Sequence, residues 1–173
     1  VLESRSHAEK RGAKILATIK GVGMSADAYH ISAPRNDGEG VKLAIEAALK
    51  DAQLTPADIG YVNTHGTSTP LGDIAECNAI YQVFGGNVSH LKVNSSKGMI
   101  GHMLGAASAI EGIISIKSLE AQKVHGSVNI TEKDPEILLD VCENGSMDHK
   151  FDYAMSNSFG FGGHNSVVIF GRP

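Results

Sequence analysis

The chain has 173 residues, of which 42% are hydrophobic and 20% charged, a composition typical of a globular domain with a core of ordinary size. Its net charge of −4 predicts no nucleic-acid partner, and no apolar run reaches the 18 residues that would predict a membrane-spanning helix. The two cysteines lack the C-x-x-C spacing of a disulfide or zinc framework, which favours a reducing compartment, by default the cytoplasm.

Strand and helix patterns alternate along the chain and end in an antiparallel pair. Helical patterns occupy residues 6–11, 38–53, 73–84 and 104–122, with a brief helical turn at 55–58. Strand patterns occupy residues 13–20, 60–63, 91–95, 153–158 and 165–170, with weaker candidates at 127–130 and 138–141. The first strand is expected to end at Gly21 and Gly23, and Asp73 with Glu76 predicts a capping box. This order predicts an α/β fold, a mixed sheet with helices on both faces.

Two histidines follow strand patterns in turns rich in glycine. His65 comes just after the strand at 60–63, and His102 follows the strand at 91–95. Because the carboxyl ends of parallel strands lie on one rim of a sheet, the two imidazoles are expected to meet. Two neutral imidazoles can donate N–H bonds to one oxygen and stabilise an enolate or a tetrahedral oxyanion. The alternative is that each histidine only satisfies carbonyl groups of its own turn, and the residues alone leave both interpretations open.

Two further features lie in the same predicted turns. Lys97 precedes an apolar helix that carries Glu111, and this pair could orient a catalytic histidine, although spacing alone favours an exposed ion pair of small value. Residues 159–163 read FGFGG between two apolar strands. They indicate either a loose hairpin, or a hinge that moves an aromatic gate and supplies a backbone N–H to an oxyanion.

Other residue classes predict no chemistry. Five histidines in polar surroundings are expected at the surface: His7, His30, His90, His125 and His149. The spacing of His, Cys, Asp and Glu matches no structural zinc site, so no metal is expected. Cys77 is expected to be a small core residue of a helix, and neither Cys77 nor Cys142 lies in a turn suited to a nucleophile.

Three motifs together resemble those of the elongating β-ketoacyl-[acyl-carrier-protein] synthases of the synthase II type. They are NTHGTSTPLGD at 63–73, NSSKGMIGHMLGAA at 94–107 and SNSFGFGG at 156–163. Initiating synthases carry Asn in place of His102, and Ser68 favours the fatty-acid branch. The resemblance implies a thiolase-like fold of five αβαβα layers. Residues 1–173 would form its C-terminal half, with 1–20 as the tail of the N-terminal half.

The resemblance also implies a reaction, a decarboxylative condensation of malonyl carrier protein with an acyl-enzyme thioester in fatty acid elongation. The nucleophilic cysteine would lie in the N-terminal half, because no residue of this chain matches it. His65 and His102 would stabilise the enolate, and Lys97 with its partner Glu111 would support the catalytic network. Phe161 would supply a backbone N–H to the oxyanion hole and gate the acyl pocket.

The substrate would be held by residues of the same motifs. Thr67 and Thr69 would bind the phosphopantetheine arm that acyl carrier protein delivers, and Phe159 would pack behind Phe161. The resemblance assigns Gly160 and Gly162 to substrate binding as well. No metal or redox cofactor is implied.

The partners implied are acyl carrier protein, the N-terminal half of the same synthase and a second copy in a homodimer, in the cytoplasm or in a plastid or mitochondrial matrix. Alternatives are a polyketide ketosynthase segment, or a non-catalytic homologue that binds carrier protein.

Overall fold

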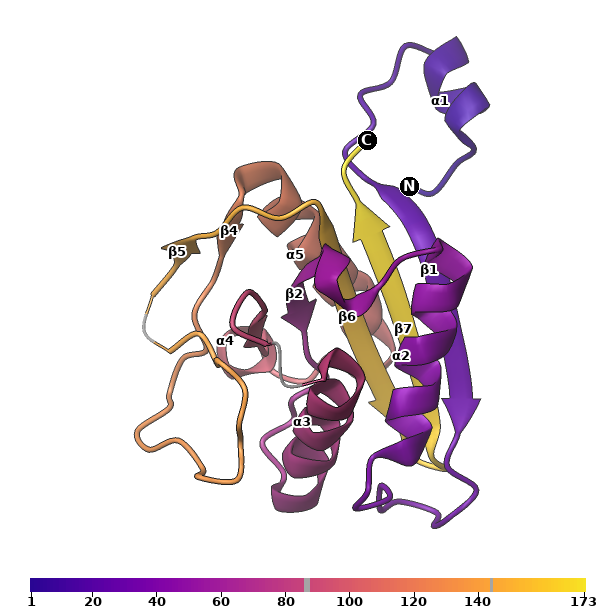
Figure 1. The fold of residues 1–173 in the computed structure, drawn as a ribbon. Helices are drawn as coiled ribbons and strands as arrows, with labels where there is room; N and C mark the ends of the chain where they lie inside the picture. Colours follow the sequence, from indigo (N-terminus) through magenta and orange to yellow (C-terminus); the bar gives the residue numbers. More distant parts are fainter. Residues whose placement is uncertain (86–87, 144) are drawn as a thin grey trace.

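Five strands within the described residues, 1–85, 88–143 and 145–173, form one mixed sheet in the computed structural model (Figure 1). Its order is β1-β7-β6-β2-β3. The strands of this sheet are β1 (Thr18–Ala26), β2 (Ile59–Asn63), β3 (Lys92–Asn94), β6 (Tyr153–Gly160) and β7 (His164–Gly171). A separate short pair consists of β4 (Lys123–Val124) and β5 (Met147–Asp148). The helices are α1 (Arg5–Lys10), α2 (Glu39–Ala52), α3 (Pro70–Phe84), α4 (Lys97–Ile100) and α5 (Ala107–Ala121), with 3-10 turns η1 (Pro56–Asp58) and η2 (Leu104–Ala106).

The strand directions bring the carboxyl ends of β2, β3 and β6 to one edge of the sheet, as predicted. β2 runs parallel to β3 and to β6, whereas β7 is antiparallel to both β1 and β6. Asn63 at the end of β2 therefore lies beside Asn94 of β3 and Ser156 of β6. His65 follows this end of β2, and Lys97 follows the same end of β3, so both leave the sheet at one edge.

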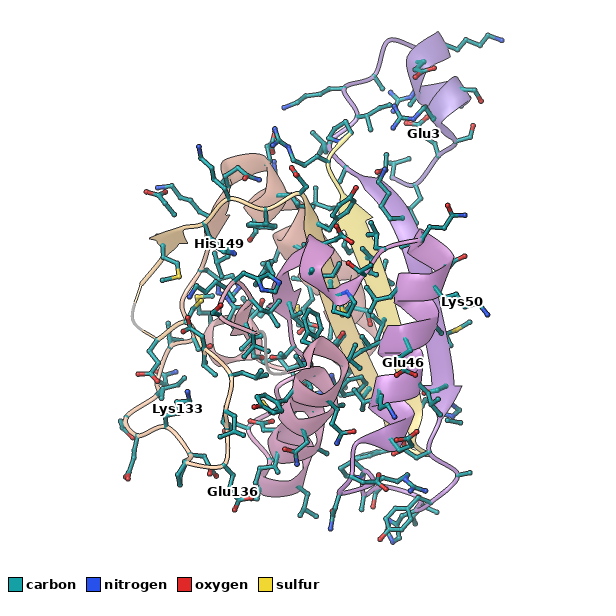
Figure 2. All side chains as sticks on the ribbon, in the orientation of Figure 1. Glu3, Glu46, Lys50, Lys133, Glu136 and His149 are labelled. Atoms are coloured by element: carbon teal, nitrogen blue, oxygen red, sulfur yellow. The ribbon has the colours of Figure 1, made fainter. Side chains whose placement is uncertain are left out.

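The sheet buries apolar side chains on both faces. Along β7, Val167 and Ile169 pack with α2 and α3, whereas Val168 and Phe170 pack with the core beneath α5. Figure 1 shows α2 and α3 on one side of the sheet and α5 on the other. The charged residues Glu46 and Lys50 lie on the exposed side of α2 (Figure 2). The predicted α/β fold with helices on both faces is confirmed.

The prediction that the first strand ends at its glycines is wrong. β1 continues through Gly21 and Gly23 to Ala26, because these glycines face the backbone of α2 rather than a turn. A Cβ atom at Gly23 would lie 1.9 Å from the carbonyl oxygen of Ala44, and one at Gly21 would lie 2.4 Å from that of Ala48. The glycines therefore permit the helix to lie directly on the strand.

We expect Gly23→Ala to lower the free energy of unfolding by about 2 to 3 kcal/mol, because a helix backbone cannot move aside for the added methyl group. Urea unfolding measures this loss. Gly105→Ala is the matched control, since a Cβ there meets no atom within 4 Å. Equal stabilities of the two variants would contradict the close approach of α2 to β1.

Two helix starts differ from the sequence prediction. α3 begins at Pro70 rather than at Asp73, because Thr69 is the N-cap and proline suits the first helical position. The expected helix at 104–122 is regular only from Ala107, after the turn η2, where Leu104 has a φ of 50°. The helix at 38–53, the turn at 55–58 and the terminal hairpin are confirmed.

The two weak strand candidates at 127–130 and 138–141 are wrong. Their backbones form only isolated bridges, Ser127 with Glu143 and Val141 with Val93, and the short strands lie at β4 and β5 instead. Leu139 is buried in the core beside α3 although its segment is irregular. Burial of Leu139 thus accounts for part of the pattern at 138–141, whereas Val128 in the other candidate is exposed.

The N-terminal segment stands apart from the sheet. Figure 1 shows α1 beyond the N-terminal end of β1, away from the other helices. Its contacts are local: Ser4 accepts a hydrogen bond from the backbone of His7, and Glu3 pairs with Arg11. The assignment of residues 1–20 to another half of a larger fold stays a prediction.

Candidate active site

The loop that carries His65 is held by a buried carboxylate. Glu76 of α3 accepts hydrogen bonds from the backbone N–H of His65 at 2.9 Å and of Gly66 at 3.0 Å. It also accepts one from the side-chain amide of Asn157 on β6 at 3.0 Å. Glu76 therefore joins α3, the loop and the sheet, and fixes where the imidazole leaves the rim.

The predicted capping box of Asp73 and Glu76 is therefore wrong. Because α3 starts at Pro70, Asp73 lies one turn inside the helix, where it accepts from the backbone N–H of Ser68 at 3.1 Å. Burial raises the pKa of Glu76 to about 7, although its three hydrogen bonds act in the opposite direction.

The raised pKa of Glu76 predicts that the stability of the fold depends on pH. Its folded pKa of about 7 lies above the ordinary value of 4.5, so the folded chain retains a proton that the unfolded chain loses between these pH values. The contribution of Glu76 to stability therefore falls as pH rises through this window, by about 3 kcal/mol. Urea unfolding of wild type and Glu76→Gln at pH 4, 5, 6 and 7 isolates this term as their difference. A difference that is constant with pH would contradict the assignment.

The two predicted histidines meet. The ring centroids of His65 and His102 are 5.6 Å apart, with the rings nearly perpendicular at 83°. The Nδ1 atom of His102 accepts the backbone N–H of Leu104 at 3.1 Å, so in the neutral ring Nε2 carries the proton. His102 is exposed and His65 is half-buried. The structure thus confirms the proximity that the strand order predicts.

His65 is held in its neutral form. Burial, the charge of Lys97 and the neighbouring His102 together lower the pKa of His65 to about 3, with burial the largest cause. A neutral imidazole carries one N–H and remains a hydrogen-bond donor throughout the physiological range.

Lys97 and Glu111 form a buried ion pair. The Lys97 ammonium donates to Glu111 Oε1, and the two side chains are only 5% and 1% exposed. The exposed pair that spacing alone favours is therefore wrong, and the pairing implied by the resemblance is confirmed. Lys97 is the first residue of α4, which follows β3, and Glu111 lies on α5, so the pair joins two helices.

The FGFGG segment forms the tight end of the β6–β7 hairpin. Gly160 pairs with His164, which leaves three residues in the connection. Gly162 and Gly163 have φ values of 85° and 73°, the left-handed region that glycine adopts without strain. The amide of Gly162 donates to the carbonyl of Ile31 at 2.8 Å, so the tip is tied to the loop after β1.

The two phenylalanines of this hairpin lie differently. The sequence predicts Phe159 behind Phe161, and the structure places the Phe159 ring against His65, with centroids 5.3 Å apart. Phe161 is 82% exposed at the tip. Its roles as a gate and as a backbone donor stay predictions.

One cavity of about 930 Å³ collects most of these groups. The predicted site residues that line it are His65, Thr67, Thr69, His102, Phe159, Gly160 and Phe161. The hydroxyl oxygens of Thr67 and Thr69 are 3.2 Å apart, because Ser68 between them has a φ of 61° and turns both toward one side. Gly162 and the Lys97–Glu111 pair are not among the lining residues.

Sequence reasoning missed a polar network behind this rim. His125, expected at the surface, is partly buried: its Nε2 atom lies 3.2 Å from Ser96 Oγ and 3.5 Å from the Tyr61 hydroxyl. His90 and His149 are partly buried as well, and only His7 and His30 of the five are exposed. Asn63 donates to Ser96 at 2.8 Å. No periodic pattern marks such residues, because each contact joins segments distant in sequence.

The cysteines are buried, as expected for Cys77. Burial raises the pKa of Cys77 to about 12 and that of Cys142 to about 11, so both are thiols at neutral pH. Within the part of the chain that the structure describes, no group of three or more His, Cys, Asp or Glu side chains could hold a metal ion. None of the helices there is both long and apolar enough to cross a bilayer.

The site therefore offers two imidazoles at one cavity, an ion pair that acts on one of them, and paired hydroxyls at the mouth. Donors at the strand ends of an α/β sheet are an arrangement that can stabilise negative charge on an oxygen. Residues 16–131 match the model of the family described as beta-ketoacyl synthase, C-terminal domain. The chain belongs to the β-ketoacyl synthase family.

Curated relatives agree with this assignment. The chain is 49% identical over 170 residues to 3-oxoacyl-[acyl-carrier-protein] synthase 2 of Staphylococcus aureus, covering 98% of this chain and 41% of that protein. It is 48% identical to the chloroplastic 3-oxoacyl-[acyl-carrier-protein] synthase I of Hordeum vulgare, covering 98% and 37%. The chain thus spans about two fifths of the length of the relatives it matches.

Solved structures share the fold. A beta-ketoacyl synthase from Burkholderia phymatum matches with a TM-score of 0.92 and 38% identity, over 99% of this chain and 41% of that one. A type II polyketide ketosynthase, solved with its acyl-carrier protein, matches with a TM-score of 0.95 and 38% identity, over 99% and 42%. The thiolase-like fold implied by the resemblance is confirmed for this half.

Proposed function

We propose that the chain is the C-terminal half of an elongating condensing enzyme, which joins a malonyl thioester to an acyl-enzyme thioester with loss of CO₂. The observation that carries this proposal is the His65–His102 pair on one cavity, with His65 kept neutral by burial and by Lys97. Two uncharged donors suit an oxygen on which negative charge develops.

The reaction needs such donors at one step. When CO₂ leaves the malonyl group, the electron pair of the broken C–C bond moves onto the thioester carbonyl and forms an enolate. The N–H groups of His65 and His102 would stabilise the enolate oxygen. The enolate carbon then attacks the acyl thioester, and the sulfur of the nucleophile leaves as a thiolate. The backbone N–H of Phe161 would bind the oxygen of that second, tetrahedral intermediate.

The nucleophile would belong to another part of the enzyme. Cys77 and Cys142 are buried thiols whose raised pKa values make them poor nucleophiles at neutral pH. We therefore assign the nucleophilic cysteine to an N-terminal half, and residues 1–20 to the segment that leads from it.

The surface supports a partner on the α5 side of the sheet. Val22 of β1 lies opposite Val168, which faces the core beneath α5, yet Val22, Met24 and Ile113 of α5 are exposed. An apolar surface of this kind is typical of a protein interface. The N-terminal half would cover it, and a second copy would complete a homodimer.

We assign substrate delivery to acyl carrier protein. Thr67 and Thr69, whose hydroxyls lie together at the cavity, would bind the phosphopantetheine arm, with Gly160 and Gly162 beside it. The chemistry requires no metal or redox cofactor. Two unpaired thiols suit the cytoplasm, or a plastid or mitochondrial matrix.

The chain is 49% identical to a synthase 2 but 38% identical to the polyketide ketosynthase of known structure. This difference favours fatty acid elongation over polyketide synthesis. The intact His65, His102, Lys97 and Glu111 argue against a non-catalytic homologue that only binds carrier protein.

The test is a reconstitution. The chain, assembled with a half that carries the nucleophile, is given acyl and malonyl carrier protein, and the products and the acylated residue are identified by mass spectrometry. We expect a ketoacyl product two carbons longer and an acyl group on the other half. Acylation of Cys77 or Cys142 would contradict the proposal, as would the absence of a condensation product.

A further inference from the structure

The residue before the buried lysine is held by a histidine that the proposed reaction does not use. Ser96 is fully buried and stands at the N-cap position of α4, yet its side chain caps no backbone group of that helix. Its hydroxyl instead lies between the side-chain amide of Asn63, 2.8 Å away, and the Nε2 atom of His125, 3.2 Å away.

The proton positions in this network follow from the groups at its two ends, the carbonyl of Gly126 and the side-chain amide of Asn63. His125 Nδ1 lies 3.0 Å from the carbonyl oxygen of Gly126, which can only accept, so Nδ1 carries the proton. The neutral ring then presents a lone pair at Nε2. The Asn63 amide can only donate, so Ser96 Oγ accepts from Asn63 and donates its own proton to His125. With this arrangement of protons, each of the three contacts joins one donor to one acceptor.

Ser96 in turn fixes the turn that carries the candidate site. Its carbonyl accepts the backbone N–H groups of Met99 at 3.0 Å and Ile100 at 3.2 Å, and the carbonyl of Lys97 accepts that of Gly101 at 2.9 Å. His102 follows directly. A shift of Ser96 would therefore move Lys97 relative to Glu111, and His102 relative to His65.

We propose that His125 is a positioning residue for this site: its neutral imidazole accepts the Ser96 hydroxyl and thereby fixes the turn that places Lys97 and His102. A second contact holds the histidine in place, because the side-chain amide of Asn94 donates to its backbone carbonyl. Tyr61, whose hydroxyl donates to Asn94 at 2.8 Å, closes the network on the side of the sheet. The proposal rests on the proposed function only for its kinetic test.

The kinetic test compares His125→Leu with His125→Gln in the assembled synthase. Glutamine can place an acceptor near the Nε2 position, whereas leucine fills the space without one. We expect the leucine variant to lower kcat for condensation on the order of 10- to 100-fold with KM for malonyl carrier protein unchanged. We expect the glutamine variant to remain within about threefold of wild type.

His149→Leu is the matched control, because it also removes a partly buried imidazole bond, the 2.9 Å contact from Nε2 to the Gly60 carbonyl, but at the other end of β2. We expect its kcat to equal that of wild type. A wild-type kcat in His125→Leu would overturn the proposal. Equal losses in the leucine and glutamine variants, or an equal loss in His149→Leu, would also overturn it, since these mark a merely structural effect.

A spectroscopic measurement tests the proposal without activity. ¹⁵N NMR of the histidine rings in the wild-type assembled protein is expected to show His125 protonated at Nδ1 and unprotonated at Nε2 at neutral pH. A proton on Nε2 would overturn the proposal, because Ser96 could then not donate to it. If the wild-type assembly does not condense its substrates, the proposed function fails and this tautomer alone decides about His125. The same measurement decides if the leucine variant does not fold.

Discussion

We expect His65→Ala and His102→Ala each to lower the rate of CO₂ loss from malonyl carrier protein by about 10²- to 10³-fold in the assembled synthase, because each would remove one proposed donor to the enolate oxygen. The loss is expected in kcat, since the donors act on charge that develops only as CO₂ leaves. The two effects are not expected to add fully, because the rings, with centroids 5.6 Å apart, serve one oxygen.

His7→Ala is the control for this experiment. His7 is exposed on α1, where it pairs with Glu3, and its loss should leave the rate unchanged. A rate in either His65→Ala or His102→Ala within a factor of two of wild type would rule out that histidine as a donor. Release of CO₂ is measured directly, so the result does not depend on the acylation step.

Lys97→Met and Glu111→Gln each lower the free energy of unfolding, for the lysine by about 3 to 5 kcal/mol, because the partner is left as a buried charge without compensation. Urea unfolding measures the loss. The double variant Lys97→Met with Glu111→Leu removes both charges and is expected to recover most of the stability.

Activity separates the two roles of this pair. The charge of Lys97 acts on His65, and it would also favour negative charge on an oxygen that His65 binds. The double variant lacks this charge, so it should stay slow although it is stable. A double variant with wild-type activity would show that the pair only supports the fold. A Lys97→Met variant as stable as wild type would contradict burial of the pair.

The parts of the fold that follow from local pattern were predictable. The alternation of strand and helix places His65 and His102 on one rim, and the FGFGG turn between apolar strands gives the hairpin. The role of the glycines of β1 was not predictable. Glycine occurs both in turns and where two backbones approach closely, and only the position of α2 decides between these roles.

Long-range polar contacts could not be predicted from the local sequence pattern either. The burial of Lys97 and Glu111 depends on where the fold places α4 relative to α5, and the spacing of residues along one segment does not predict this. Glu76 looks like a helix cap in the sequence, yet its carboxylate reaches the backbone of His65 eleven residues earlier and Asn157 on another strand. Such roles become visible only once the sheet order is known.

The proposed enolate site depends most directly on the neutral state of His65. ¹⁵N NMR of the ring from pH 8 to pH 4 tests it. We expect no protonation of His65 in this range, because burial and Lys97 lower its pKa to about 3. The contribution of His65 to stability should correspondingly fall as pH falls below 6.5, where the unfolded imidazole gains a proton that the folded one does not. Titration of His65 with an ordinary midpoint near pH 6.5 would contradict the account.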